Sequence, residues 1–319
     1  MPAPIALFAY RRALHLERAI EALRSNPEAR DSSLYVFSDG PKDASATESV
    51  EQVRGLLGRI SGFASVHRVF RDENFGLARN ITNGVSDVLS RHNTVIVIED
   101  DIVVSSLFLR FMNDALSYYQ GETRVGSISG YCYPIACTAP ETYFIRGADC
   151  WSWATWRDRW QHFNPDGRDL LAQLRGRNLT REFDFDGAMG FTRMLEDQIA
   201  GKNDSWAVRW HASCFLRDLL ILYPGRPLAE NIGTDGSGTH CGSDRSLDVD
   251  LSSTAVSVRA VPVEENMAMR AAIRDFFLQM RRRAPDVSGR SPHLKMRLRS
   301  VLDYLATEIR HRAPWRNRS

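Results

Sequence analysis

Long apolar runs are rare in this sequence of 319 residues. The run from Ile5 to Ala9 is too short for a signal-peptide core, and its positive charges follow the run instead of preceding it. The runs Thr94 to Ile98 and Leu219 to Tyr223 are far below the roughly 20 residues that a helix needs to cross a bilayer. We therefore expect the protein to stay in the cytoplasm.

Cysteine is scarce, and its spacing is uninformative for metal binding. The sequence has five cysteines in no CxxC pair: Cys132, Cys137, Cys150, Cys214 and Cys241. A disulfide framework uses an even number of cysteines, and a structural zinc site needs closely spaced pairs of ligands. We expect reduced thiols, as in an intracellular protein.

An excess of one charge is also missing, since 41 basic and 39 acidic residues give a formal net charge of +2. This balance argues against a nucleic-acid binder. It hides two unlike parts, because residues 270–319 hold 13 Lys and Arg against four Asp and Glu. The first 269 residues then hold 28 basic and 35 acidic residues, a net charge of −7. An acidic body and a basic tail are predicted.

Apolar runs and helical patterns alternate along the first hundred residues, which predicts an α/β fold with a mostly parallel, doubly wound sheet. The expected strands are Pro4–Tyr10, Leu34–Phe37, Ser65–Phe70 and Thr94–Ile98, and a helix is expected over Asn74–Leu89. Ligands of such sheets bind beyond the carboxyl ends of the strands. Further strand-like pieces follow at Val125–Ser129 and Thr142–Ile145.

Three carboxylates, Glu99, Asp100 and Asp101, follow the apolar strand Thr94–Ile98 directly. Carboxylates that share a strand end repel one another, and a hard divalent cation such as Mg²⁺ or Mn²⁺ relieves that repulsion. Such a cation can bridge the phosphates of a nucleoside diphosphate and neutralise it as a leaving group. The alternative is a solvated acidic turn without a metal.

Several segments, in the same order, resemble the GT-A glycosyltransferases, in particular bacterial family 2-like enzymes and the group similar to N-acetylglucosaminyltransferase I. The triplet is EDD where many of these enzymes have DxD, which suits the N-acetylglucosaminyltransferase-like group. The matching segments are Phe37–Gly40, Asn74–Asn80 (NFGLARN), Glu99–Asp101, Gly147–Trp156 (with WSWATW) and Asn203–Trp206 (NDSW).

The resemblance implies a GT-A fold and a role for each acidic residue at the strand ends. Asp101 would bind Mn²⁺ or Mg²⁺ directly, and Asp100 would contact the ribose or the metal shell. Glu99 would support the donor sugar. Asp39 lies in the segment that contacts the nucleotide base. Arg79 and Arg146 are candidate contacts for the phosphates. The alternative for each of these arginines is an ion pair at the surface.

Asp204 is the candidate catalytic base. An inverting transfer needs a carboxylate that takes the proton of the acceptor hydroxyl, and the resemblance of the NDSW segment implies this role. The alternative is that Asp204 only caps the helix that follows it. Other carboxylates compete for the role: Asp184, Asp186, Glu196 and Asp197.

His240 is the second candidate metal ligand, because a neutral imidazole binds Mn²⁺-like ions and some GT-A enzymes supply a late histidine. A histidine on a surface loop is the alternative. It lies in the glycine-rich segment Gly233–Gly242, whose backbone amides could face a diphosphate when the loop closes.

Four tryptophans lie between residues 151 and 160, where aromatic faces could pack on a sugar. Trp153, Trp156 and Trp160 fall at helical spacing, which favours core packing instead. We expect Trp156 and Trp160 in the core and Trp151 and Trp153 nearer the sugar. Two further candidates for sugar or acceptor contacts are Asp149 and Trp206.

The expected organisation is a catalytic domain over residues 1–262 and a basic helical tail over 263–319. The nucleotide-binding half covers about residues 1–105 and the acceptor half about 106–262. Two amphipathic helices are expected in the tail, with apolar stripes along Met269–Met280 and Leu294–Ile309. They either attach to an anionic inner-leaflet surface or pack on the catalytic domain.

Together these features predict a metal-dependent, inverting glycosyltransferase of hexose or N-acetylhexosamine. It would take a nucleoside-diphosphate sugar, with UDP expected, and a glycan or lipid-linked acceptor of surface-polysaccharide assembly such as lipopolysaccharide. A sugar-nucleotide pyrophosphorylase is disfavoured, because the first strand is followed by Tyr10-Arg11-Arg12-Ala13 without glycines. A membrane or nucleic-acid adaptor remains the non-enzymatic alternative.

Overall fold

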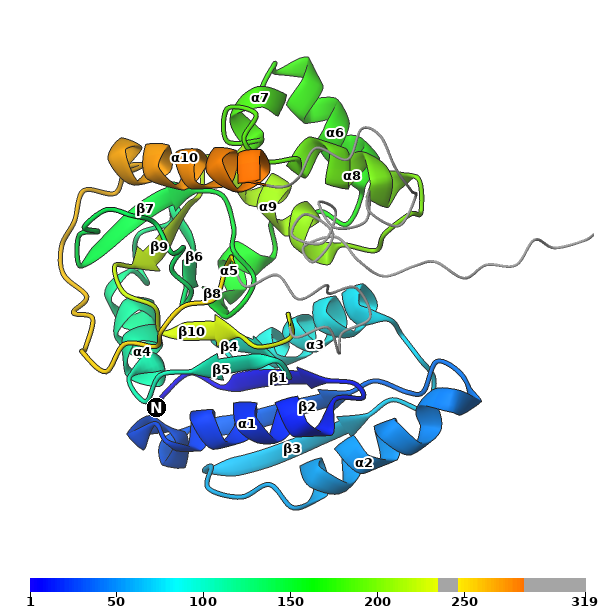
Figure 1. Cartoon of the computed structure of the whole chain (residues 1–319). Coiled ribbons are helices and arrows are strands. Elements are labelled where there is room, and N and C mark those ends of the chain that lie inside the picture. The colour runs from blue at the N-terminus through cyan, green and yellow to red at the C-terminus, as the bar shows by residue number, and fades with distance from the viewer. Residues whose placement is uncertain (235–245, 284–319) are drawn as a thin grey trace, which may run out of the picture.

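The computed structural model describes residues 1–234 and 246–283, and it contains one large mixed sheet (Figure 1). The order of its eight strands is β3-β2-β1-β4-β8-β6-β9-β7, and a second sheet pairs β10 with β5. The strands are β1 Ile5–Ala9, β2 Ser33–Ser38, β3 Ser65–Phe70, β4 Thr94–Glu99, β5 Ile102–Val104, β6 Val125–Ser129, β7 Thr142–Arg146, β8 Trp153–Trp156, β9 Leu220–Pro224 and β10 Ala229–Asn231.

Helices pack on both faces of the large sheet. They are α1 Ala13–Arg24, α2 Thr47–Gly58, α3 Leu77–Arg91, α4 Phe108–Tyr118, α5 Arg157–Trp160, α6 Gly167–Gly176, α7 Thr180–Phe183, α8 Phe191–Ile199, α9 Trp206–Leu216 and α10 Met267–Arg283. Along β1, Ala6 and Phe8 belong to the apolar cluster that includes α3, α9 and α10, whereas Leu7 belongs to the cluster that includes α1 and α4. This alternation confirms the α/β fold class predicted from the sequence.

The first four sheet strands are parallel neighbours, as predicted. β1 lies between β2 and β4, and β2 pairs with β3. The helix expected from Asn74 begins instead at Leu77, because Gly76 adopts φ 73°, ψ 161° and ends the preceding loop. The carboxyl ends of these strands therefore meet at one edge of the sheet.

Strand β8 runs antiparallel to both of its neighbours, β4 and β6. Val97 of β4 is paired with Trp153 of β8 in an antiparallel register. As a result, the turn just before β8 lies at the same edge as the carboxyl end of β4. The GADCWS segment and the acidic triplet are brought together by this antiparallel pairing.

The tryptophan segment differs from its expected form. Trp153–Trp156 is a strand instead of the start of a helix, and helix α5 begins only at Arg157. Trp156 and Trp160 are buried as expected. Trp153, which was expected nearer the sugar, is also buried: it is 1% exposed and packs against Trp160 and Trp206. Its contact with a sugar stays a prediction.

Helix α10, the first part of the predicted tail, packs on the body across β7 (Figure 1). Met269, Ile273 and Phe277 are buried within the cluster that includes α3 and α9. The packing alternative therefore applies to this helix. The second expected helix, Leu294–Ile309, lies outside the described residues. Within the described residues, no helix is long and apolar enough to span a membrane.

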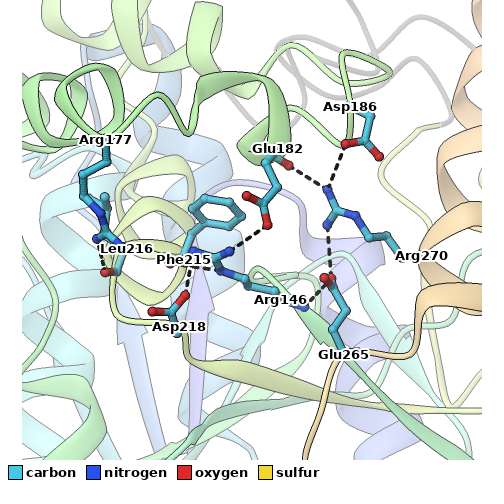
Figure 2. Close-up of polar contacts among 9 residues, drawn as sticks. All are labelled: Arg146, Arg177, Glu182, Asp186, Phe215, Leu216, Asp218, Glu265 and Arg270. Carbon is cyan, nitrogen blue, oxygen red and sulfur yellow. Dashed lines mark hydrogen bonds and ion pairs between the residues drawn. The ribbon is translucent and has the colours of Figure 1, made fainter.

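A network of charged groups fastens α10 to the body (Figure 2). The guanidinium of Arg270 pairs with Glu265 at 3.1 Å and Asp186 at 3.8 Å, and donates to the backbone oxygen of Glu182 at 2.8 Å. Beside it, Arg146 of β7 pairs with the Glu182 carboxylate at 2.7 Å. The helix is thus held by buried apolar contacts and by charge.

Candidate functional site

The acidic triplet lies at the carboxyl end of β4, beside the end of β1. Asp100 is 5% exposed and Asp101 is 1% exposed, so both carboxylates are buried at the sheet edge. The backbone N–H of Tyr10, just after β1, donates to Asp100 Oδ2 at 3.0 Å. The parallel pairing of β1 with β4 sets this contact, because it aligns Phe8 with Glu99.

Arg12 supplies positive charge to two of these carboxylates. Its Nη2 lies 3.1 Å from Asp100 Oδ1 and 2.7 Å from Asp101 Oδ2. From the sequence, a divalent cation was expected to neutralise these carboxylates. In the structure, Arg12 neutralises part of their charge. Two carboxylates still form a suitable donor set, because Mg²⁺-like ions are commonly held by one or two carboxylates together with substrate phosphates.

Burial and mutual repulsion raise the pKa values of two members of the triplet, Glu99 and Asp100. Burial raises the pKa of Glu99 to about 8, with a further contribution from Asp101 and Asp100 and an opposing one from Arg12. Burial also raises the pKa of Asp100, and Arg12 opposes that rise. A cation bound at this edge would favour the ionised forms of both groups.

The start of the glycine-rich segment lies against Asp101. Strand β10 pairs with β5, which follows the triplet, and the N–H of Ile232 donates to the backbone oxygen of Asp101 at 2.9 Å. A Cβ on Gly233 would collide with Asp101 Oδ2 and lie 2.8 Å from Arg12 Nη1. Glycine is therefore required here by the close approach of the backbone to the carboxylate.

His240, the other predicted metal ligand, lies outside the described residues. Within residues 1–234 and 246–283, no three His, Cys, Asp or Glu side chains form a metal-binding group. Its role stays a prediction. The four cysteines in the described part are free thiols, in agreement with the expectation of reduced cysteines.

Asp39 holds a loop together at the neighbouring strand end. Its two carboxylate oxygens accept hydrogen bonds from the backbone N–H groups of Gly40, Phe75 and Gly76, and from the side chain of Asn74. These donors join the end of β2 to the start of α3. The Asp39 carboxylate already accepts four hydrogen bonds from this loop. We therefore expect Asp39 to affect nucleotide binding by holding the loop in place.

The two arginines considered for phosphate binding have other partners. Arg79 lies on the surface, 3.6 Å from Glu73, with its guanidinium 3.7 Å from the centre of the Phe75 ring. Arg146 is mostly buried in the network with Glu182 and Asp218, at 2.7 and 2.8 Å (Figure 2). The ion-pair alternative therefore describes both side chains in this structure.

Asp149 is a buried carboxylate in the turn before β8. It accepts hydrogen bonds from the Tyr133 hydroxyl and from the N–H of Trp151, each at 3.0 Å. Burial raises the pKa of Asp149, and these two hydrogen bonds oppose the rise. Burial raises the thiol pKa of the adjacent Cys150, and Asp149 adds to this rise. The pairing of Val97 with Trp153 places this turn at the same sheet edge as the triplet.

Trp151 and Trp206, both predicted sugar or acceptor contacts, are buried. Trp151 is 7% exposed and packs edge-on against Tyr131. Trp206 is 2% exposed and packs against Trp153, with ring centres 5.5 Å apart. The structure assigns Trp206 to the core, and this contact fixes the start of α9 beside β8.

Asp204 precedes α9 and does not cap it. The cap is Ser205, whose hydroxyl accepts a hydrogen bond from the N–H of Val208. The capping alternative for Asp204 was therefore wrong. Its half-buried carboxylate pairs with Arg209 at 3.3 Å, and burial raises its pKa while Arg209 lowers it. Trp206 packs on Trp153, which brings the start of α9 beside β8.

Sequence reasoning missed Tyr133 as a member of this site. It expected Arg11 or Arg12 to approach the nucleotide, and it did not predict that Arg12 pairs with the acidic triplet almost 90 positions later. Tyr133 carried no motif at all. One available signal was that a buried acidic triplet needs a nearby cation, and Arg12 follows the strand that pairs with β4.

The chain matches no protein-family model and no curated protein. Among solved structures it is similar to TarS of S. aureus, with 14% identity and a TM-score of 0.27 over 38% of this chain. It spans a fifth of TarS, since 20% of that chain is covered. It is also similar to the mannosyltransferase PcManGT from Pyrobaculum calidifontis, with 13% identity, a TM-score of 0.36, and 68% of this chain and 72% of that chain covered. Both likenesses are distant, and the fold described above rests on the sheet topology.

Proposed function

We propose that the chain is a metal-dependent glycosyltransferase that uses a nucleoside-diphosphate sugar. The observation that carries the proposal is the edge at which β1, β4 and β10 end together. There Asp100 and Asp101 lie beside Arg12 and the backbone of Gly233. Carboxylates, an arginine and a close backbone at the carboxyl ends of parallel strands suit a diphosphate and its cation.

In this proposal Asp101, assisted by Asp100, holds Mn²⁺ or Mg²⁺ together with the diphosphate. The bound cation supplies charge neutralisation to the departing nucleoside diphosphate. Glu99 lies just before these ligands and would support the donor sugar, as would Asp149 from the facing turn. His240 is retained as a second ligand, to be tested separately. The nucleotide expected is UDP, and PcManGT was solved with GDP-Man and Mn²⁺, so GDP is tested beside it.

Asp204 is proposed as the base of an inverting transfer. Its carboxylate takes the proton of the acceptor hydroxyl, whose oxygen bonds to the anomeric carbon as the bond to the diphosphate breaks. Three features support the assignment: half-burial, a pKa raised by burial, and a helix cap supplied by Ser205 instead. Arg209, 3.3 Å away, keeps the carboxylate oriented.

The acceptor proposed is a hydroxyl of a surface-glycan precursor, with a lipid-linked oligosaccharide at the inner leaflet to be tested first. On α10, Arg270 is buried and Arg281 donates to the backbone oxygen of Gly187, so these two arginines are engaged with the body of the protein. No nucleic-acid partner is proposed.

Calorimetry with UDP and GDP, each with and without Mn²⁺, tests the donor site. Wild type is expected to bind one nucleotide in a metal-dependent way, and Asp101→Asn is expected to lose this binding. Asp114→Asn, on the exposed side of α4, is the matched control. Absence of metal-dependent binding of either nucleotide to the wild type would falsify the proposal.

Asp204→Asn separates chemistry from binding. Turnover is expected to fall by roughly 10²-fold or more, because general-base catalysis contributes about that much. Binding of the nucleotide with Mn²⁺ should stay within about twofold of wild type. If Asp204→Asn keeps its turnover, another carboxylate is the base. Asp184 would be tested next, because burial also raises its pKa.

A further inference from the structure

Arg12 occupies the position at which a cation would meet the acidic edge. One nitrogen, Nη2, contacts Asp101 Oδ2 at 2.7 Å and Asp100 Oδ1 at 3.1 Å. The side chain of Asp101 is 2% exposed and that of Asp100 is 7% exposed, so these pairs are only weakly screened by solvent. Arg12 therefore stabilises two carboxylates that would otherwise repel each other.

The same oxygens are the candidate donors to the divalent cation. A guanidinium and a metal ion cannot both occupy the space next to Asp101 Oδ2, where the backbone of Gly233 already limits the room. A cation that binds at Asp101 Oδ2 therefore displaces Arg12 from that oxygen. That exchange costs free energy, because a buried, hydrogen-bonded charge pair is broken.

An anion that binds at this edge can receive the displaced guanidinium. Arg12 immediately precedes α1, whose first turn carries no acidic residue. Its Nη1 faces Gly233, at the start of the segment that follows β10. A diphosphate that arrives with the cation brings negative charge to this edge, and guanidinium groups bind phosphate oxygens well.

We propose that Arg12 is an exchangeable counter-ion. Without nucleotide it holds Asp100 and Asp101, and it opposes the binding of a divalent cation. When the cation arrives with a nucleoside diphosphate, Arg12 transfers to the phosphates and strengthens the complex. This inference rests on the proposed function, and it makes cation and nucleotide binding cooperative through one side chain.

Electron paramagnetic resonance of Mn²⁺ measures the exchange directly, because it counts free ions and needs no turnover. The affinity for Mn²⁺ is measured alone and with saturating UDP or GDP, for wild type, Arg12→Gln and Arg12→Lys. Arg11→Gln is the matched control, since Arg11 lies over the Tyr10 ring, 5.8 Å from its centre, on the same loop.

Arg12→Gln is expected to change the two affinities in opposite directions. Mn²⁺ alone should bind about tenfold tighter than to wild type, because the competing charge is gone, and Mn²⁺ with nucleotide should bind about tenfold more weakly. Arg12→Lys should lie between Arg12→Gln and wild type in both measurements. The control should match wild type within about twofold in both.

Two results would overturn the inference: Arg12→Gln binds Mn²⁺ alone no more tightly than wild type, or both affinities change in the same direction. Circular dichroism checks that each variant is folded, and Arg12→Lys carries the test if Arg12→Gln is not. Failure of the proposed function gives a different pattern, in which the wild type shows no nucleotide-dependent binding of Mn²⁺ at all.

Discussion

Replacing Arg270 by alanine removes the charge that joins α10 to the body of the protein. The side chain is 4% exposed and contacts Glu265, Asp186 and the backbone oxygen of Glu182 (Figure 2). Its guanidinium also lies 4.7 Å from the centre of the Phe185 ring. All these contacts are lost together in the variant.

The expected loss is about 3 kcal/mol, at the lower end of the range of roughly 3–5 kcal/mol for removing one partner of a buried pair. The lower end applies because Glu265 keeps a second donor, the N–H of Arg146 at 2.9 Å. Asp186 is also half-exposed and regains water. At roughly 2 °C per kcal/mol for a domain of this size, the melting temperature should fall by about 6 °C.

Urea and thermal unfolding followed by circular dichroism measure the change. Arg274→Ala is the control, because Arg274 lies on the same helix and pairs with Asp275 at the surface. Its loss should be below about 1 kcal/mol, as for other exposed ion pairs. If Arg270→Ala and Arg274→Ala lose equal free energy of unfolding, the network of charged groups does not stabilise the attachment of α10. The apolar contacts would then account for that attachment.

Three further changes probe the site and its support. Gly233→Ala should weaken nucleotide binding with Mn²⁺ by about tenfold in calorimetry, because its Cβ meets a metal-ligand carboxylate, whereas Gly176→Ala, whose Cβ meets nothing within 4 Å, should change nothing. Burial lowers the pKa of His211 to about 3 from 6.5, so the unfolded chain takes up the proton first. The contribution of His211 to stability is therefore present above pH 6.5 and is lost as the pH falls toward 3. His211→Gln should show a shallower fall of the unfolding free energy over that window, and an unchanged slope would contradict this. Tyr133→Phe removes a hydrogen bond that lowers the pKa of Asp149, so the loss of donor binding on acidification should move to higher pH. An identical pH profile of KM would exclude a role for this carboxylate in donor binding.

The parallel half of the fold could be predicted from local sequence. Apolar runs, the alternation along Ser65–Phe70 and the turn residues between them predicted β1 to β4. The bounds of β3 and β6 agree with the expected Ser65–Phe70 and Val125–Ser129. In these segments the pattern of apolar residues and the tertiary environment point to the same structure. The bounds of β1, β2 and β4 differ from the expected ones by at most one residue at each end. The start of α3 moved further, from Asn74 to Leu77, because Gly76 takes a positive φ.

Strand β8 could not be predicted in the same way. All four of its residues are buried, with Trp153 in one apolar cluster and Trp156 in the other, so the strand shows no polar alternation. The spacing of the tryptophans then resembles a helix by coincidence. Residues 153–156 form a strand because they pair with β4, and this long-range contact cannot be read from the local sequence.

The sequence predicted which acidic residues lie at the candidate site, but it did not predict their hydrogen-bond and ion-pair partners. Asp100 and Asp101 follow an obvious core strand, and the structure places them together at the sheet edge. The partner Arg12 is almost 90 residues away, and Asp39 finds its donors in residues 74–76, more than 30 positions later. Long-range partners of this kind appear only once the strands have been brought side by side.

The late position of α10 has a consequence for biosynthesis. Its Phe277 packs on Tyr133, and Met269 and Ile273 complete the apolar cluster that also contains Tyr143 of β7. A nascent chain that has formed its sheet therefore exposes this apolar face until residue 277 has been made. Chain release before that point leaves this apolar face uncovered and prone to aggregation.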